Sequence, residues 1–271
     1  MNVTVRIPGK RAERRAAAGS GGKRAAARAC GEGNSPGMQV CFLAGDRYPL
    51  DRPIEDALRA RLDAELSGWL GQDEILRRCG GRLPMCVEDR VAALRAVLAT
   101  EATGGLILIG RSSGARVATA FAARHGARAV ICLGYPFRNP DHVIQPERFV
   151  DLATLAVPTL IVQGTDDPYG GADITENYAL SPAVSVRFIR ADHELDLSPA
   201  QWDDIAATVR AFLQHAAAGV RFQPHRFDEA FYLACYPDVA EAVAAGRLAS
   251  GEQHYRIYGQ AERRRFRYVV E

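Results

Sequence analysis

The sequence predicts an α/β protein in which a mostly parallel β-sheet has helices on both faces. Five short apolar runs alternate along the chain with amphipathic helical segments, which is the order expected for such a fold. These runs are continuously apolar, as is typical of parallel strands that are buried on both faces. With 271 residues, 48% of them apolar, the chain is long enough for one large domain with a sizeable core and a small appendage.

The expected strands and helices follow in chain order. The strands are the apolar runs 39–44, 104–110, 127–134, 157–164 and 184–189. Helices are expected from Pro53 to about Leu66, over 87–99, over 113–125 and in a short stretch near 147–153. A long helix begins after Ser198, because a serine cap followed by Pro199 is a standard helix start. The segment 70–86 is ambiguous, since EILRRC within it also fits a strand.

Residues 1–37 differ from the rest of the chain in charge. They carry eight arginines and lysines against two glutamates, a net charge of +6, whereas the remainder sums to −4. This tail is rich in Ala, Gly and Arg and has no long apolar run, so we expect it to be disordered. A basic arm for nucleic acid or an acidic surface and an organelle-targeting peptide both fit its composition. We favour a solvated extension, or an upstream start codon with Met38 as the natural first residue.

Apolar runs and cysteines indicate the compartment. No apolar run approaches the ~20 residues that cross a bilayer, and no apolar segment of a secretory signal follows the basic residues. The six cysteines form no C-x-x-C pair and no Cys/His cluster with zinc spacing. We therefore expect a cytoplasmic protein with no membrane span and no structural metal.

The stretch Gly110-Arg111-Ser112-Ser113-Gly114 joins an expected strand to an expected helix. Its glycines stand two residues before and two after Ser112, which is the G-x-S-x-G pattern of a nucleophile elbow. Ser113 does not meet this rule, because Arg111 and Ala115 occupy its equivalent positions. A structural turn and a phosphate-binding turn are the alternatives. Nucleotide binding is disfavoured, since no G-x-G-x-x-G occurs here and no acidic residue ends the next strand.

Polar residues also follow two later strands. Asp166 and Asp167 come after the run 157–164, and His193 comes after the run 184–189. In parallel sheets, functional groups collect at the carboxyl ends of the strands. A catalytic serine needs a base within hydrogen-bond reach, and the base needs an orienting carboxylate. The chain order Ser, Asp, His is also that of α/β hydrolases.

At these residues the chain resembles the α/β-hydrolase superfamily, over residues of about 38–217, especially its small, lid-poor branch near dienelactone hydrolases. VPTLIVQGTDDPYG is similar to the acid-strand motif of that superfamily, and RADHEL is similar to its base loop. The resemblance implies an esterase-like serine hydrolase that acts on a small-molecule carboxylic ester or related acyl bond, without cofactor or metal. It assigns Ser112 as nucleophile, His193 as base and Asp167 as acid, with Asp166 as second choice.

The early strand departs from the superfamily pattern. Members commonly carry His-Gly or a glycine cluster after this strand, which supplies half of the oxyanion hole, whereas LAGDR leaves Gly45 alone here. We expect a backbone donor from Gly45 or Asp46, alongside the Ser113 N–H. An inward Asp46 side chain would disfavour the oxyanion, and loss of one donor typically costs ~10²–10³ in turnover. Arg111 is expected either to line the substrate mouth or to be solvated.

Other histidines and the tryptophans are expected to be structural. Trp69 and Trp202 fit packing positions better than binding positions. The histidines assigned to the surface or to turns are His125, His142, His215, His225 and His254.

The last fifty residues do not continue the sheet pattern. Short helices are expected from Asp228 to before Pro237, from Asp238 to Gly246, and from the cap Ser250 to Gly259. Their expected small core consists of the aromatic residues Phe227, Phe231, Tyr232, Tyr236, Tyr255 and Tyr258. The segment resembles a short helical module appended to various bacterial proteins, including some glycosyltransferases. We therefore divide the chain into a tail at 1–37, a hydrolase domain at 38–219 and a helical module at 220–271.

A second hypothesis comes from a different class of protein. A hydrolase-like scaffold with weak or no catalysis could bind a protein partner, or a second copy of the chain, through residues 220–271. Neither a membrane nor a nucleic acid is an expected partner.

Overall fold

The computed structural model describes residues 38–63, 66, 68–82, 84, 86–99, 103–141 and 145–269, and the structural statements below refer to these residues. The basic tail at 1–37 and His142 lie outside them. The expectations for that tail and that histidine therefore stay predictions.

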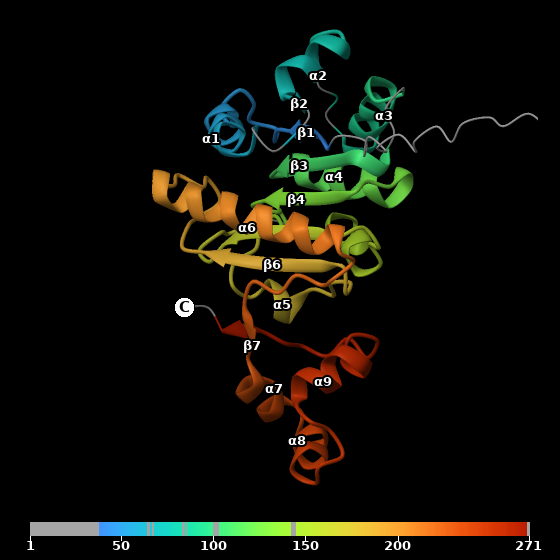
Figure 1. The fold of residues 1–271 in the computed structure, drawn as a ribbon, viewed down its shortest axis with the longest axis vertical. Helices are drawn as coiled ribbons and strands as arrows, with labels where there is room; N and C mark the ends of the chain where they lie inside the picture. The colour runs from blue at the N-terminus through green and yellow to red at the C-terminus, as the bar shows by residue number, and fades with distance from the viewer. Residues whose placement is uncertain are drawn as a thin grey trace, which may run out of the picture. The chain divides into compact units, whose positions relative to one another are not determined.

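Six parallel strands form the main sheet, in the order β2-β1-β3-β4-β5-β6 (Figure 1). Their bounds are β1 Gln39–Leu43, β2 Gly68–Leu70, β3 Leu106–Arg111, β4 Ala129–Leu133, β5 Thr159–Gly164 and β6 Val184–Ile189. The predicted fold class is confirmed, and all five predicted strands are present. The sequence pattern misses β2, because three residues are too few to show a period, and only pairing with β1 reveals it.

Helices cover both faces of this sheet. On one face, α1 (Arg52–Leu62) and α6 (Pro199–Ala217) pack against Val40 and Phe42 of β1. On the other face, α3 (Val87–Val97) and α4 (Ser113–His125) pack against Cys41 and Leu43 of the same strand. Successive side chains of a strand point to opposite faces, so a continuously apolar strand supplies two cores at once.

The ambiguous segment 70–86 contains a helix, α2 (Gln72–Arg78), so a strand at EILRRC is wrong. Acidic residues in its first turn and arginines in its last turn match the helix dipole. Its Ile75 is buried, and the Gln72 side-chain oxygen accepts a hydrogen bond from the Ala44 N–H at 2.8 Å. Thus α2 satisfies a backbone group just beyond the end of β1.

The long helix α6 begins as the sequence predicts. Ser198 Oγ accepts from the Gln201 N–H at 3.4 Å, while Gln201 Oε1 accepts from the Ser198 N–H at 3.0 Å. This reciprocal capping box satisfies two backbone donors at the helix start. The shorter elements are 3₁₀ helices at Thr103–Gly105, Pro146–Arg148 (η3) and Val150–Ala153, and the one-turn helix α5 at Ile174–Asn177.

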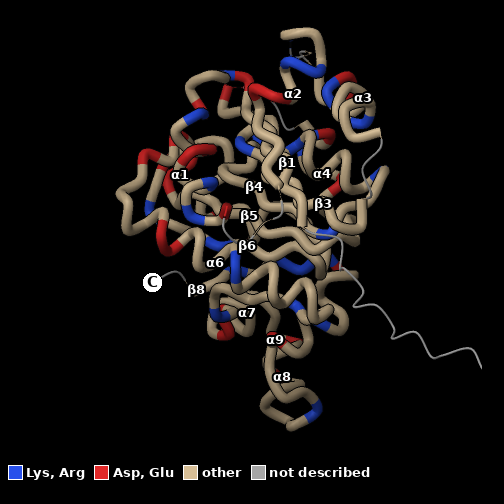
Figure 2. Tube along the Cα trace, turned by 45° about the horizontal axis from the view of Figure 1, so that its top comes forward, with Lys and Arg blue, Asp and Glu red and all other residues tan. Residues whose placement is uncertain are grey.

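Charged residues of both signs are interspersed along α1 and α2 (Figure 2). Exposed pairs such as Arg52–Asp73, at 2.7 Å, join neighbouring elements. Pairs of this kind contribute little, typically below ~1 kcal/mol. Two arginines near the carboxyl end of the sheet, Arg90 and Arg111, are buried instead.

The C-terminal segment forms short helices and one short antiparallel pair of strands. The predicted helices are present as α7 (Glu229–Cys235), α8 (Pro237–Ala244) and α9 (Gly251–His254), the last continued by a π-helical turn at Tyr255–Gly259. The antiparallel pair β7 (Arg226–Phe227) and β8 (Tyr268–Val269) is not predicted. Two-residue strands carry no periodic signal, and only pairing between distant residues creates them.

Five aromatic side chains are buried in this segment. They are Phe227, Tyr232, Tyr255, Phe266 and Tyr268. The expected core member Tyr258 is 51% exposed, so that assignment is wrong, whereas Phe266 and Tyr268 come from a tail with no helical pattern. This aromatic group is continuous with the core on the α3 and α4 face of the main sheet.

Candidate active site

Three predicted residues meet at the carboxyl end of the main sheet. Ser112 follows β3, Asp167 follows β5 and His193 follows β6. The Ser112 Oγ lies 2.9 Å from His193 Nε2, and His193 Nδ1 lies 2.8 Å from Asp167 Oδ2. Residues spread over 81 positions of sequence thus form one chain of hydrogen bonds.

The turn at Ser112 is strained, as the glycine spacing predicts. Ser112 has φ 50° and ψ −122°, a conformation that L-residues rarely adopt. A Cβ on Gly110 would lie 2.4 Å from the Ala115 Cα, and one on Gly114 would lie 2.1 Å from the Leu43 carbonyl oxygen. Gly110 therefore lets β3 approach α4 this closely, and Gly114 lets the start of α4 approach the end of β1.

Asp167 is the carboxylate that reaches the histidine. It is 2% exposed, and its Oδ2 also accepts from Gln163 Nε2 at 2.9 Å. Its Oδ1 accepts from the Tyr169 N–H at 2.7 Å. Asp166 is exposed and accepts only from the Thr165 hydroxyl, at 3.2 Å. The structure therefore brings Asp167, and not its neighbour Asp166, into the site.

The neighbours of His193 assign its tautomer. The Asp167 carboxylate can only accept, so Nδ1 carries the proton and Nε2 accepts from the Ser112 hydroxyl. The Tyr169 ring packs on the imidazole with centroids 4.4 Å apart. This arrangement suits proton transfer between Ser112 and His193 Nε2.

Arg111 lies beside His193 and is not solvated. It is 2% exposed, donates through Nη2 to the His193 carbonyl oxygen, and places Nη1 3.5 Å from His193 Nε2. Its Nε lies 3.6 Å from Asp51 Oδ1. Burial lowers the pKa of Arg111, and the nearby Asp51 carboxylate opposes that effect. Arg111 also lines the cavity, as one of its two predicted placements requires.

The structure corrects the expectation for Gly45. The Gly45 N–H donates to Asp51 Oδ2 at 2.7 Å, so it is not available to an oxyanion. Within the described residues, the backbone N–H groups of Asp46 and Ser113 have no acceptor. Asp51 precedes a proline-started helix and would be read as its cap, but its side chain makes no capping hydrogen bond there.

The Asp46 carboxylate is held by other groups. Asp46 Oδ1 accepts from the Ser113 hydroxyl at 2.7 Å and lies 3.2 Å from Arg90 Nη1. Arg90 is 5% exposed and also donates to the Ala44 carbonyl oxygen and to Ser113. The positive charge of Arg90 offsets the negative charge of Asp46, which would disfavour an oxyanion if its side chain pointed inward. Arg90 lies in an ordinary amphipathic helix pattern, and nothing in the nearby sequence indicates that it belongs to the site.

A cavity of about 350 Å³ opens over Ser112 and His193. Its lining includes Gly45, Asp46, Arg111, Arg116, Arg148 and Tyr169. This volume is near the lower end of typical small-molecule sites, ~300–1,000 Å³. Among the described residues, no three His, Cys, Asp or Glu side chains are grouped as metal ligands.

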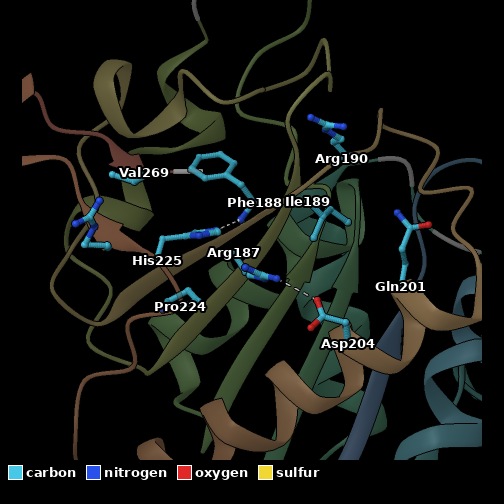
Figure 3. A pocket seen from close by; sticks show the side chains of 10 residues that line it. Arg187, Phe188, Ile189, Arg190, Gln201, Asp204, Pro224, His225 and Val269 are labelled. Atoms are coloured by element: carbon cyan, nitrogen blue, oxygen red, sulfur yellow. Dashed lines mark hydrogen bonds and ion pairs between the residues drawn. The ribbon is translucent and has the colours of Figure 1, made fainter. Parts of the chain in front are cut away.

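Other singled-out residues lie outside this cavity. His125 and His215 are exposed, as expected, and both tryptophans pack within the fold. His254 is buried and contacts the Tyr232 hydroxyl at 3.1 Å, so its surface assignment is wrong. His225 is half-buried against β6 beside a second cavity of about 580 Å³ (Figure 3). No helix in the described part of the chain is both long and apolar enough to span a bilayer.

The chain is similar to several solved structures. A protein from Xanthomonas campestris pv. campestris, described as a hydrolase of the alpha/beta superfamily, is 20% identical over 67% of this chain and 98% of its own, with a TM-score of 0.47. Est1E from Butyrivibrio proteoclasticus is 14% identical over 69% of this chain and 91% of its own, with a TM-score of 0.49. No curated protein matches the sequence.

A match to a protein family decides the classification. The family described as an alpha/beta hydrolase domain matches residues 72–221, more than half of the chain. The matched range contains Ser112, Asp167 and His193. The chain therefore belongs to the family of alpha/beta hydrolase domains.

Proposed function

We propose that this protein is a serine hydrolase of carboxylic esters or related acyl bonds in small molecules. The observation that carries the proposal is the hydrogen-bond chain from Ser112 through His193 to Asp167, at 2.9 and 2.8 Å. In this proposal Ser112 is the nucleophile, His193 the general base and acid, and Asp167 the group that orients the imidazole.

The reaction divides into acylation and deacylation. Ser112 Oγ attacks the carbonyl carbon while His193 Nε2 takes the hydroxyl proton. The tetrahedral intermediate collapses, the bond from carbon to the alcohol oxygen breaks, and His193 returns the proton to that oxygen. Water then attacks the acyl-serine with the same nitrogen as base, which releases the acid and restores the Ser112 hydroxyl.

Two backbone donors are proposed for the oxyanion. Asp46 and Ser113 line the same cavity as Ser112, and their backbone N–H groups have no acceptor among the described residues. Arg90 and the Ser113 hydroxyl hold the Asp46 carboxylate, which leaves its backbone N–H available. Loss of one such donor typically lowers turnover by ~10²–10³-fold.

We assign the reaction to the cytoplasm within the same proposal. Its support is that the five cysteines in the described part of the chain, Cys41, Cys79, Cys86, Cys132 and Cys235, are free thiols.

A fluorophosphonate probe tests the proposal, because it reacts with an activated serine and needs no knowledge of the substrate. The wild-type protein should label and should hydrolyse short-chain p-nitrophenyl esters, and Ser112→Ala should do neither. Ser113→Ala is the matched control: it removes the hydroxyl contact to Asp46 but retains the backbone N–H, so it should still label. Equal labelling of wild type and Ser112→Ala would overturn the proposal. A folded wild type that does not label would favour the non-catalytic scaffold.

A further inference from the structure

Two arginines line the cavity over Ser112 without a carboxylate partner in the described part of the chain. Arg116 lies in the first turn of α4, four residues after Ser112, and Arg148 ends the 3₁₀ helix η3. Both side chains are half-buried. Neither one forms an ion pair with a described aspartate or glutamate within 4.0 Å.

The carboxylates of the same cavity are already engaged. Asp46 is bound by Arg90 and the Ser113 hydroxyl, at 3.2 and 2.7 Å. Asp51 accepts from the Gly45 N–H and lies beside Arg111. Glu194 pairs with Arg47 at the rim. No acidic group of the cavity lining remains to neutralise the other two arginines.

The contacts of Arg116 and Arg148 leave donors unused. Arg116 Nη2 donates to the Glu147 backbone oxygen at a long 3.5 Å, and its buried Nε has no partner. Arg148 Nε donates to the Gln145 side chain, while the Glu147 carboxylate is exposed and forms no ion pair with either arginine. Burial and then the positive charge of Arg116 lower the pKa of Arg148, and the negative charge of Glu147 opposes them. Two partly desolvated guanidinium groups thus face one space, an arrangement that an anion would stabilise.

We propose that the substrate is a small ester bearing a second, anionic group, which binds between Arg116 and Arg148 while its carbonyl carbon lies at Ser112. This inference rests on the proposed serine hydrolase function. Guanidinium groups bind carboxylate and phosphate through paired N–H donors, so either anion meets the requirement. A cavity of about 350 Å³ restricts the substrate to a small molecule.

Two matched ester pairs test this preference on the full chain. p-Nitrophenyl hemisuccinate carries a carboxylate on its acyl part, and p-nitrophenyl butyrate is the neutral counterpart. 4-Acetoxybenzoate carries a carboxylate on its alcohol part, and methyl 4-acetoxybenzoate is the neutral counterpart. Corrected for their rates of alkaline hydrolysis, the anionic member of at least one pair should have a kcat/KM about 10- to 100-fold higher.

Variants and inhibitors test where the anionic group of the substrate binds. Arg116→Gln and Arg148→Gln should each reduce the ratio of anionic to neutral kcat/KM about tenfold or more. Arg124→Gln is the control, because Arg124 is an exposed arginine of the same helix outside the cavity, and its ratio should match wild type. Glutarate or inorganic phosphate should inhibit hydrolysis of the neutral ester competitively, and the more potent inhibitor identifies the preferred anion.

The two proposals fail differently. If wild type labels with fluorophosphonate and hydrolyses neutral esters, yet shows no anionic preference and no inhibition by either anion, the anion site is wrong and the hydrolase remains. If wild type does not label, the hydrolase proposal itself is wrong. The comparison of ester pairs on wild type needs no variant, so an unstable arginine variant does not obscure the result.

Discussion

Two histidines lie next to strand β6, one in the candidate site and one in the C-terminal segment. His193 follows the strand and contacts Ser112 on one ring nitrogen and Asp167 on the other. His225 accepts a hydrogen bond from the Phe188 N–H of the strand at 2.7 Å (Figure 3). Its ring also packs against the rings of Phe188 and Tyr268.

The two histidines differ in the groups that their ring nitrogens contact. His193 has the Ser112 hydroxyl on one ring nitrogen and the buried Asp167 carboxylate on the other, and it lines an open cavity. His225 has a backbone donor and aromatic neighbours, and burial, together with Arg187, lowers its pKa to about 4. It satisfies a backbone group of an edge strand that would otherwise require water. The same residue type therefore lies in the candidate site in one region and joins the C-terminal segment to a strand in the other.

The largest effect should come from the carboxylate that orients His193. Asp167→Asn should lower kcat by about 10³- to 10⁴-fold, because the base loses its orienting charge and its preferred tautomer. Steady-state kinetics on a p-nitrophenyl ester measures the loss, and circular dichroism checks folding.

Asp166→Asn is the matched control for that change. Its carboxylate is exposed and contacts only Thr165, so kcat should change less than about threefold. If the control variant loses more activity than Asp167→Asn, the acid has been assigned to the wrong aspartate.

Removal of the C-terminal segment should affect stability and leave the chemistry intact. A chain that ends at Gly219 exposes Phe188 and lacks the His225 acceptor of its N–H. The free energy of unfolding should therefore fall by about 3 kcal/mol. Its melting temperature should fall by roughly 6–12 °C, and Ser112 should still label with fluorophosphonate. A cooperatively folded truncated protein that no longer labels would show that the segment contributes to the site.

The third effect is a pH dependence from His225. Its pKa in the folded protein, about 4, is below the unfolded value of 6.5, so the unfolded state binds the proton more tightly between these values. Stability is therefore fully present above pH 6.5 and is lost as the pH falls toward 4, by roughly 1–2 kcal/mol for a half-buried ring. Urea titrations at several pH values measure this loss.

His225→Gln isolates the contribution of that one histidine. Glutamine can still accept from the Phe188 N–H but does not titrate. The variant should lose part of the stability change between pH 6.5 and pH 4, and an unchanged pH slope would contradict the assignment.

The smallest effect concerns the strained serine. Ser112→Gly should stabilise the protein by about 1 kcal/mol relative to Ser112→Ala, because glycine adopts φ 50° without a steric penalty. Both variants lose the nucleophile, so thermal melts compare backbone strain alone. If glycine is no more stable than alanine, the turn does not store the strain inferred from its backbone angles.

Local sequence patterns were sufficient to predict much of the fold. Continuous apolar runs identify all five strands longer than three residues, and the spacing of Gly110, Ser112 and Gly114 identifies the strained turn. Ser198 and Pro199 mark the start of α6. These features depend on near neighbours, because periodicity, helix capping and backbone sterics all act within a few residues.

The tertiary structure alone decided which groups meet. It gave the Gly45 N–H to Asp51 and buried Arg111 beside His193. It also formed β2 and the β7–β8 pair, and it left Arg116 and Arg148 facing one cavity. Each of these outcomes depends on the relative positions of separate elements in three dimensions, and local sequence patterns do not carry that information.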